Sequence, residues 1–311
     1  MKTAEGKIFD NQPAEEVIDF LKSNTYNYYT VSPRDLQLIN DNSWLYLRIN
    51  QKQPKTLKLR TSFLKKLLRW YNLPNDLAEK LTEDLFLKML NELLNKIKSY
   101  EVSIKTENNE ALTITSMLFT ELKDLEVYEL IKDLNVKSIS RNDLMTRFYT
   151  EKKTVAAPVK GDFCGFGFDV VNSETGFSSL SFNHFILRYV CRNGATAPIN
   201  IYDAKKNHYD ESRQSLSQFL NEQKNHSLKS REKLILAMKQ SNDVASIKFK
   251  NSAITRLNYI IGSWKGNEYM KGFDWQKSKY ELFNFVTHRA KDYEINQRYQ
   301  LERLAGEIIL N

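Results

Sequence analysis

The spacing of the aliphatic residues changes from a two-residue to a helical period within one short stretch, and this change constrains the fold most. Leucine or isoleucine occupies every second position from Trp44 to Ile49, and the alternation resumes from Thr56 to Arg60. Such alternation is typical of a β-hairpin with one buried face. From Ser62 onward the apolar residues follow helical spacing instead. The sequence therefore predicts an α+β fold in which antiparallel β-hairpins pack with helices.

The same two periods predict the other elements. We expect helices over residues 14–23, 62–72, 76–99, 121–133, 141–149, 183–194, 211–240, 245–259 and 274–311. We expect further strands over residues 100–105, 111–116, 163–171, 177–182 and 199–202. Three regions follow: an N-terminal α+β region with the basic hairpin over 1–155, a β-rich signature region over 156–210, and a basic helical C-terminal region over 211–311.

The composition excludes several classes of protein. Of the 311 residues 41% are apolar, which is enough to close a core. No apolar run approaches the ~18 residues of a membrane span. The two cysteines, Cys164 and Cys191, have no other cysteine at metal-ligand spacing. We expect a protein of the cytoplasm of a bacterial host cell, without a membrane partner, a disulfide, a metal or another cofactor.

No residue pattern identifies a catalytic centre. The chain lacks a glycine-rich nucleotide loop, and its four histidines show no metal-ligand spacing. Asp162, Asp169 and Glu174 match no nuclease motif, and Cys191 is better explained as small core filling than as a nucleophile. The sequence therefore favours a role that is not enzymatic and names no catalytic residue.

The positive charge of the chain is concentrated in one segment. The 46 Lys and Arg residues exceed the 38 Asp and Glu residues, for a net charge of +8. The stretch from Asn42 to Asn75 holds eight basic residues and no acidic one. An excess of this kind attracts polyanions.

The polar face of the predicted basic hairpin combines aromatic and basic side chains. Unpaired bases stack on aromatic rings while Lys and Arg neutralise phosphates, so single-strand binding requires both types on one surface. This face carries Trp44, Tyr46, Arg48, Lys58 and Arg60. We expect it to bind single-stranded nucleic acid with little sequence preference.

A second basic and aromatic segment lies in the C-terminal region, between residues 248 and 280. Its candidate nucleic-acid contacts are Lys248, Lys250, Arg256 and Lys265. The alternative is that its aromatic residues pack a helical core and its lysines are only solvated. A binder that uses both segments requires them on one continuous face.

Two stretches of the signature region resemble a known family. Residues 169–176, DVVNSETG, followed by Leu187 to Gly194, LRYVCRNG, resemble the paired NSE-x-G and R-x-V-C-x-N-G motifs of the phage/plasmid-like protein family, domain of unknown function nine-three-two. Residues 283–287, FNFVT, and Leu67 to Pro74 are similar to further family motifs, whereas residues 112–122 depart from them. The resemblance implies a phage or plasmid setting beside replication and recombination genes, and it implies no known reaction.

The signature residues have two readings. They are Asn172, Ser173, Glu174, Gly176, Arg188, Cys191, Asn193 and Gly194. We expect the polar ones to meet as one cluster with a mainly architectural role, with Glu174 and Arg188 close together. The alternative is a recognition turn that meets a phosphate or a partner.

Two classes of function remain. The first is a nucleic-acid-binding accessory protein, with single-stranded DNA favoured over RNA, that acts in binding or annealing during recombination or replication. The second is a phage interaction protein without nucleic-acid activity, either an inhibitor of a host system or a virion-associated component. A homo-oligomer and a host protein partner stay open in both.

Overall fold

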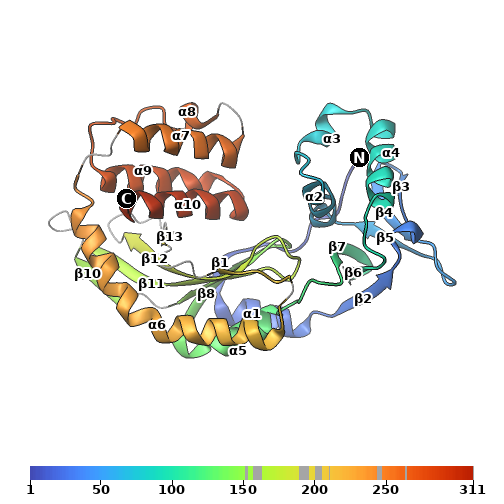
Figure 1. Cartoon of the computed structure of the whole chain (residues 1–311), viewed down its shortest axis with the longest axis horizontal. Helices are drawn as coiled ribbons and strands as arrows, with labels where there is room; N and C mark the ends of the chain where they lie inside the picture. Colours follow the sequence, from blue (N-terminus) through green and yellow to red (C-terminus); the bar gives the residue numbers. More distant parts are fainter. Residues whose placement is uncertain are drawn as a thin grey trace.

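Two β-sheets form the body of the protein in the computed structural model, which describes residues 1–150, 153–156, 163–188, 196–199, 205–209, 211–243, 247–262 and 265–310. Helices α2 to α4 stand on one sheet at one end of the molecule, and α7 to α10 stand at the other end (Figure 1). The expected α+β class and the helical C-terminal region are confirmed.

The N-terminal sheet has six strands in the order β2-β6-β7-β5-β4-β3, all antiparallel except the β5–β7 pair. Its strands are β2 (Tyr26–Val31), β3 (Leu36–Asp41), β4 (Trp44–Ile49), β5 (Lys55–Leu59), β6 (Val102–Glu107) and β7 (Glu110–Ser116). The turn between β6 and β7 places Asn108 at φ 51° and Asn109 at φ 62°. Asparagine tolerates this left-handed conformation, which a two-residue hairpin turn requires. Both hairpins expected in this region are confirmed.

Helices cover one face of this sheet. They are α2 (Thr61–Trp70), α3 (Leu77–Lys80) and α4 (Glu83–Asn95), after the short 3-10 turn η1 (Pro33–Asp35). Leu45, Leu47 and Leu57 are buried beneath them, as the alternation predicts. The single helix expected over 76–99 is wrong, because Leu81 and Thr82 adopt extended backbone and separate α3 from α4.

The second sheet has eight strands. Its main path is β1-β8-β9-β11-β12-β13, with β10 paired to β11 and β14 paired to β12. The strands are β1 (Phe9–Pro13), β8 (Val136–Arg141), β9 (Thr146–Thr150), β10 (Lys153–Ala156), β11 (Phe163–Asn172), β12 (Leu180–Arg188), β13 (Thr196–Ile199) and β14 (Lys205–Lys206).

Helices pack on both faces of the second sheet. Helix α1 (Ala14–Ser23), helix α5 (Asp124–Ile131), which continues into η2 (Lys132–Leu134), and helix α6 (Arg213–Gln240) run along its outer face (Figure 1). On the other face, Tyr299 of α10 lies within hydrogen-bond distance of Asn183 on β12. The remaining helices are α7 (Ile247–Ile261), α8 (Lys265–Tyr269), α9 (Lys279–Arg289), η3 (Ala290–Asp292) and α10 (Ile295–Leu310).

Three expected helices are wrong in this half of the molecule. Residues 141–149 belong to the β8–β9 hairpin, and residues from Asn183 to Arg188 continue strand β12. Strand β9 is buried along its whole length, so the alternation that would have identified it is absent. The expected helix over 274–311 is two helices, α9 and α10, separated by η3.

Candidate functional site

The polar face of the β4–β5 hairpin keeps four of its five expected members. Tyr46 pairs with Lys58 across the two strands, and Arg48 is exposed. Trp44, Tyr46 and Lys58 are half-buried. The Lys58 ammonium lies 3.5 Å from the centroid of the Trp44 ring. This cation–π contact covers the ring that an incoming base would need.

Arg60 does not belong to that exposed face. Its side chain is only 4% exposed. The guanidinium pairs with Glu107, with Glu110 at 2.7 Å and with Asp143 at 3.0 Å. The parallel pairing of β5 with β7 brings Glu110 beside this end of the strand. The expectation that Arg60 contacts phosphates is therefore wrong, because three carboxylates already surround it.

The second basic segment does not join the hairpin face. Strands β4 and β5 lie at the opposite end of the molecule from α7 and α8 (Figure 1). Arg256 pairs with Glu307, and Lys265 is exposed at the start of α8. Tyr269, Phe273 and Trp275 pack in the helical core, as the alternative reading holds. The side chains of Lys248 and Lys250 lie outside the described residues.

The first stretch of the signature residues, Asn172 to Glu174, is buried and bonded internally. The Asn172 amide donates to the Leu122 carbonyl and to Asp124, both at 2.8 Å. The Ser173 hydroxyl donates to the Leu144 carbonyl at 2.6 Å. Glu174 accepts from the Lys105 ammonium at 2.6 Å. These bonds fasten the turn after β11 to the loop before α5 and to the N-terminal sheet, which is an architectural role.

The expected meeting of Glu174 with Arg188 is wrong. Arg188 pairs with Cys164 at the far end of the β11–β12 hairpin, while Ser181 pairs with Val171 near the turn. Arg188 lies seven positions along the extended strand from Ser181, a length of about 23 Å. The Arg188 side chain and residues Cys191, Asn193 and Gly194 lie outside the described part of the chain.

Opposing charges set the acidity of this buried cluster. Burial beside Glu174 raises the pKa of Asp124 to about 6. Burial also opposes ionisation of Glu174, but Lys105 and Arg141 outweigh it and lower the pKa of Glu174. The cluster is thus a closed ion-pair network.

A basic hollow lies beside this network, on the exposed side of α2. Its volume is about 470 Å³, and α2 contributes Lys66, Arg69 and Trp70 to its wall. These positions are spaced i, i+3 and i+4, so they share one face of the helix. The other lining residues are Lys98, Ser99, Ser116, Gly176 and Tyr209. We call this set of eight residues the Lys66 pocket.

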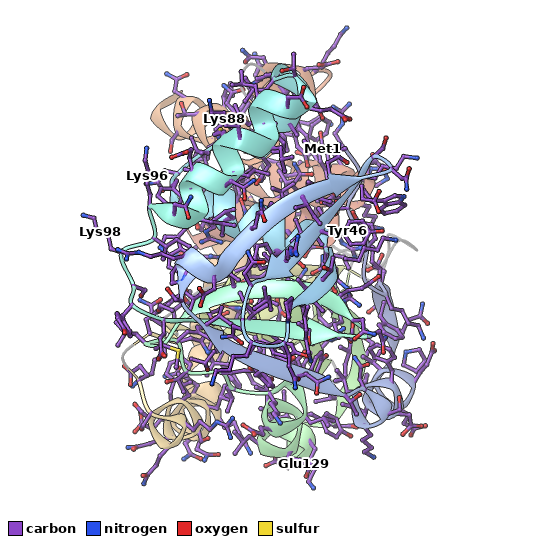
Figure 2. The ribbon with its side chains drawn as sticks, turned by 90° about the vertical axis from the view of Figure 1, so that its right-hand side faces the viewer. Met1, Tyr46, Lys88, Lys96, Lys98 and Glu129 are labelled. Atoms are coloured by element: carbon purple, nitrogen blue, oxygen red, sulfur yellow. The ribbon has the colours of Figure 1, made fainter. Side chains whose placement is uncertain are left out.

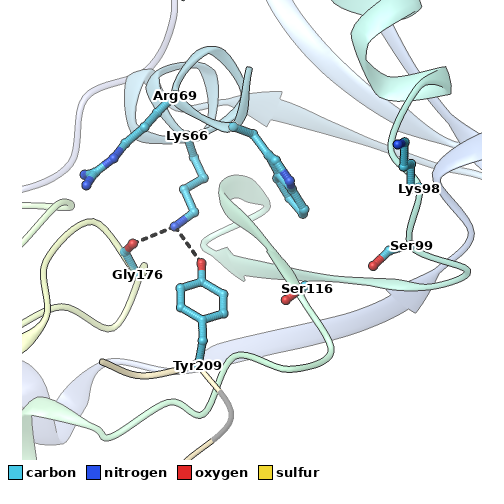
Figure 3. A pocket seen from close by; sticks show the side chains of 8 residues that line it. Lys66, Arg69, Lys98, Ser99, Ser116, Gly176 and Tyr209 are labelled. Carbon is cyan, nitrogen blue, oxygen red and sulfur yellow. Dashed lines mark hydrogen bonds between the residues drawn. The ribbon is translucent and has the colours of Figure 1, made fainter. Parts of the chain in front are cut away.

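Lys66 is the buried cation of the pocket. It is 6% exposed, and its ammonium donates to the Gly176 carbonyl at 2.6 Å and to the Tyr209 hydroxyl at 3.2 Å (Figure 3). No carboxylate pairs with it among the described residues. Burial and the nearby Arg69 guanidinium lower the pKa of Lys66 to about 7. A buried ammonium without an anionic partner is costly, and an anionic ligand would supply that partner.

The backbone of the signature turn forms one wall of the pocket. Gly176 has φ +71°, and a Cβ there would lie 2.8 Å from the Lys66 ammonium nitrogen. The Arg69 guanidinium donates to the Phe177 carbonyl at 2.6 Å. Lys98 and Ser99 lie on the opposite side of the hollow from Arg69 and Gly176 (Figure 3). Glycine at 176 therefore leaves room for the ammonium group.

Exposed apolar side chains lie in the pocket lining or close to it in sequence. Two of them line the pocket, and the other three follow the lining residues Ser99 and Ser116 in sequence. They are Trp70, Tyr100, Met117, Leu118 and Tyr209, of which Tyr100 is 91% exposed. Exposed apolar patches of this kind mark binding sites. Three of the five residues are aromatic, and we call these three, Trp70, Tyr100 and Tyr209, the aromatic rim.

A second hollow, of about 630 Å³, lies on the helical region. Lys277, His288 and Arg289 line it, but so do Asp274 and Glu281. Because the lining carries both charges, we expect no preferential binding of an anion in this hollow. The lining of the Lys66 pocket, by contrast, contains no acidic residue.

Sequence reasoning identified the basic segment but not this pocket. Lys66, Arg69 and Trp70 fall within the acid-free stretch, on the side of the helix that its apolar residues leave free. That spacing was a usable signal. Lys98, Gly176 and Tyr209 come from three distant parts of the chain, and no spacing rule brings them to α2.

Comparisons with protein-family models, with curated proteins and with solved structures gave no significant match. Within the described residues, no group of three or more His, Cys, Asp or Glu side chains is arranged to hold a metal ion. No helix in the same part of the chain is long and apolar enough to cross a membrane.

Proposed function

We propose that this chain binds single-stranded nucleic acid, with a phosphate in the Lys66 pocket and bases on its aromatic rim. The observation that carries the proposal is the buried Lys66 ammonium, which has two neutral hydrogen-bond acceptors and no carboxylate partner in the described structure. A phosphate beside it would complete an ion pair in a partly desolvated site, where charge-assisted hydrogen bonds are strong.

The aromatic rim favours the binding of single strands over the binding of duplexes. Trp70 and Tyr209 line the pocket beside its cations, and both are exposed. In a duplex the bases already stack on one another, whereas unpaired bases are free to stack on such rings. Stacking accepts any base, so little sequence preference follows.

The β4–β5 face is a secondary contact in this proposal. In the view of Figure 2, Lys96 and Lys98 extend from one side of the molecule and Tyr46 lies toward the other. Arg48 is exposed there, while Lys58 covers Trp44. A strand that leaves the pocket would have to cross the surface to reach that face. The pocket is therefore the primary site.

The resemblance of the signature motifs to phage and plasmid proteins gives the proposal its setting. We propose an accessory role in recombination or replication of a mobile element. The exposed apolar side chains at the pocket also suit a protein partner. An interaction protein that targets a host system or a virion is therefore the second candidate.

The test is fluorescence polarisation with single-stranded DNA, single-stranded RNA and duplex DNA across a salt series. We expect tighter binding of single strands than of duplex. One phosphate held in the pocket predicts a slope of about −0.7 in a plot of log affinity against log salt, and each further phosphate contact adds about the same amount. Absence of binding to every nucleic acid at low salt would favour the interaction protein.

A further inference from the structure

The size of the Lys66 pocket fits one nucleotide better than a passing strand. Its volume of about 470 Å³ lies in the range of single small-ligand sites, roughly 300–1,000 Å³. Grooves that follow a single strand instead cover about 4–16 nucleotides per domain. A pocket that admits one nucleotide admits a strand most readily at its end.

The charge of the pocket exceeds that of one phosphodiester. Lys66, Arg69 and Lys98 line it without any acidic residue. An internal phosphodiester carries one negative charge, whereas a terminal phosphate monoester carries about −1.5 to −2 at neutral pH. The monoester also offers three oxygens that accept hydrogen bonds, and Lys66 and Arg69 are donors on one helix face.

We infer that the Lys66 pocket recognises the terminal phosphate of a nucleic-acid strand, a phosphate monoester held by Lys66, Arg69 and Lys98. This inference rests on the proposed function and names the part of the nucleic acid that the pocket selects. Lys66 is the deepest of the three cations, because it is buried while Arg69 and Lys98 are exposed. The terminal phosphate enters first, and the following bases stack on the aromatic rim.

Binding of the terminal phosphate is coupled to protonation. Three titratable or charged groups adjoin Lys66: Arg69 on the same helix, and His208 and Tyr209 on the segment after β14; Lys98 faces it across the hollow. None is an acid that would hold the Lys66 proton. The His208 ring is buried, burial lowers its pKa, and its Nε2 atom has no hydrogen-bond partner among the described residues. A bound dianion therefore draws a proton to Lys66, and affinity falls as the pH rises above neutrality.

The test compares one oligonucleotide with a 5′-phosphate, with a 3′-phosphate and with hydroxyl ends, in polarisation titrations at fixed salt. We expect one phosphorylated end to raise affinity about tenfold or more, because charged hydrogen bonds replace solvent in the pocket. The Lys66→Met variant should lose that preference. Lys88→Ala, which removes an exposed lysine on α4 outside the pocket, should keep it.

Three controls keep the outcome decisive. If Lys66→Met unfolds at a lower temperature than the parent, Arg69→Met replaces it in the same titration, because Arg69 is exposed and lines the same wall. Calorimetry in two buffers of different ionisation enthalpy at pH 8 should report proton uptake for the parent with the phosphorylated strand. Inorganic phosphate should compete only weakly, because it has no base to stack.

Equal affinity for phosphorylated and hydroxyl strands would overturn the inference while leaving single-strand binding intact. So would a phosphate preference that survives in Lys66→Met or Arg69→Met. Competition by inorganic phosphate at the same concentration as the strand would assign the pocket to free phosphate. A parent that binds no strand at all would instead refute the proposed function.

Discussion

Two buried lysines of the N-terminal region have opposite surroundings. Lys105, which is 2% exposed, contacts Glu174 at 2.6 Å and Glu121 at 2.9 Å. Lys66 contacts a carbonyl and a hydroxyl, and no carboxylate in the described structure. Burial alone lowers the pKa of a lysine, but Glu174 and Glu121 outweigh it and raise the pKa of Lys105. Burial of Lys66 is not offset, and its pKa falls to about 7.

Lys105 is a structural charge, whereas Lys66 is a binding charge in the proposed function. The partners of Lys105 are supplied by the fold, since Glu174 belongs to the signature turn and Glu121 to the loop before α5. The described residues supply no carboxylate to Lys66, and in the proposed function a bound phosphate balances its charge. The difference between the two lysines lies in their partners, because both are almost fully buried.

The largest expected effect is on stability at Lys105. The Lys105→Met variant leaves Glu174 buried without its cation, which should cost about 3–5 kcal/mol in the free energy of unfolding. Urea denaturation measures this cost. The double variant Lys105→Met, Glu174→Gln should recover part of it. A single variant as stable as the parent would contradict the structural role.

The next effect is on binding at the aromatic rim. Trp70→Ala should weaken single-strand binding by about 1–3 kcal/mol, the value of one lost stack. Trp44→Ala should weaken it less, because Lys58 already covers that ring. Paired polarisation titrations, with thermal melts to confirm folding, compare the two. A larger loss in Trp44→Ala would make the β4–β5 face the primary site.

The two lysines also predict different dependences of stability on pH. Folded Lys66 is neutral above about pH 7, while the unfolded chain keeps that proton up to its ordinary pKa near 10.5. The unfolded state then holds more protons, so the contribution of Lys66 to stability rises with pH over this range. For Lys105, whose folded pKa is raised, the contribution is constant below 10.5 and is lost only above it.

The measurement is the free energy of unfolding of the parent and of Lys66→Met between pH 6.5 and 9.5, a window chosen around the pKa of about 7. The parent should gain stability relative to the variant as the pH rises. A constant difference between the two would show that Lys66 keeps its ordinary pKa in the folded protein.

The smallest effect is expected at Arg48. Its side chain is exposed on the β4–β5 face, outside the pocket. Arg48→Ala should remove at most one phosphate contact and flatten the salt dependence by about 0.7 in slope. A loss as large as that of Trp70→Ala would enlarge the binding surface to include this face.

The sequence predicted elements whose two faces differ in polarity. The β4–β5 hairpin was predictable because leucine and isoleucine face the core at every second position. The β8–β9 hairpin was not, because β9 buries polar residues such as Arg147, which pairs with Asp169 and Glu302. Such long-range ion pairs depend on tertiary contacts that local spacing does not record.

The candidate site was predictable only in part, for the same reason. The acid-free stretch contains Lys66, Arg69 and Arg60, and the alternation of the hairpin selected Arg60 as the phosphate contact. The fold places three carboxylates around Arg60 and leaves Lys66 with neutral partners. Which cation remains available to a ligand is decided by the segments that pack beside it.

In the proposed function, Lys66 holds a phosphate of a bound single strand. The most direct measurement is the dissociation constant of an end-labelled single-stranded DNA for the parent, Lys66→Met and Lys88→Ala at low salt. We expect Lys66→Met to bind about tenfold or more weakly, while Lys88→Ala stays close to the parent. Equal affinities for a folded Lys66→Met variant and Lys88→Ala would contradict it.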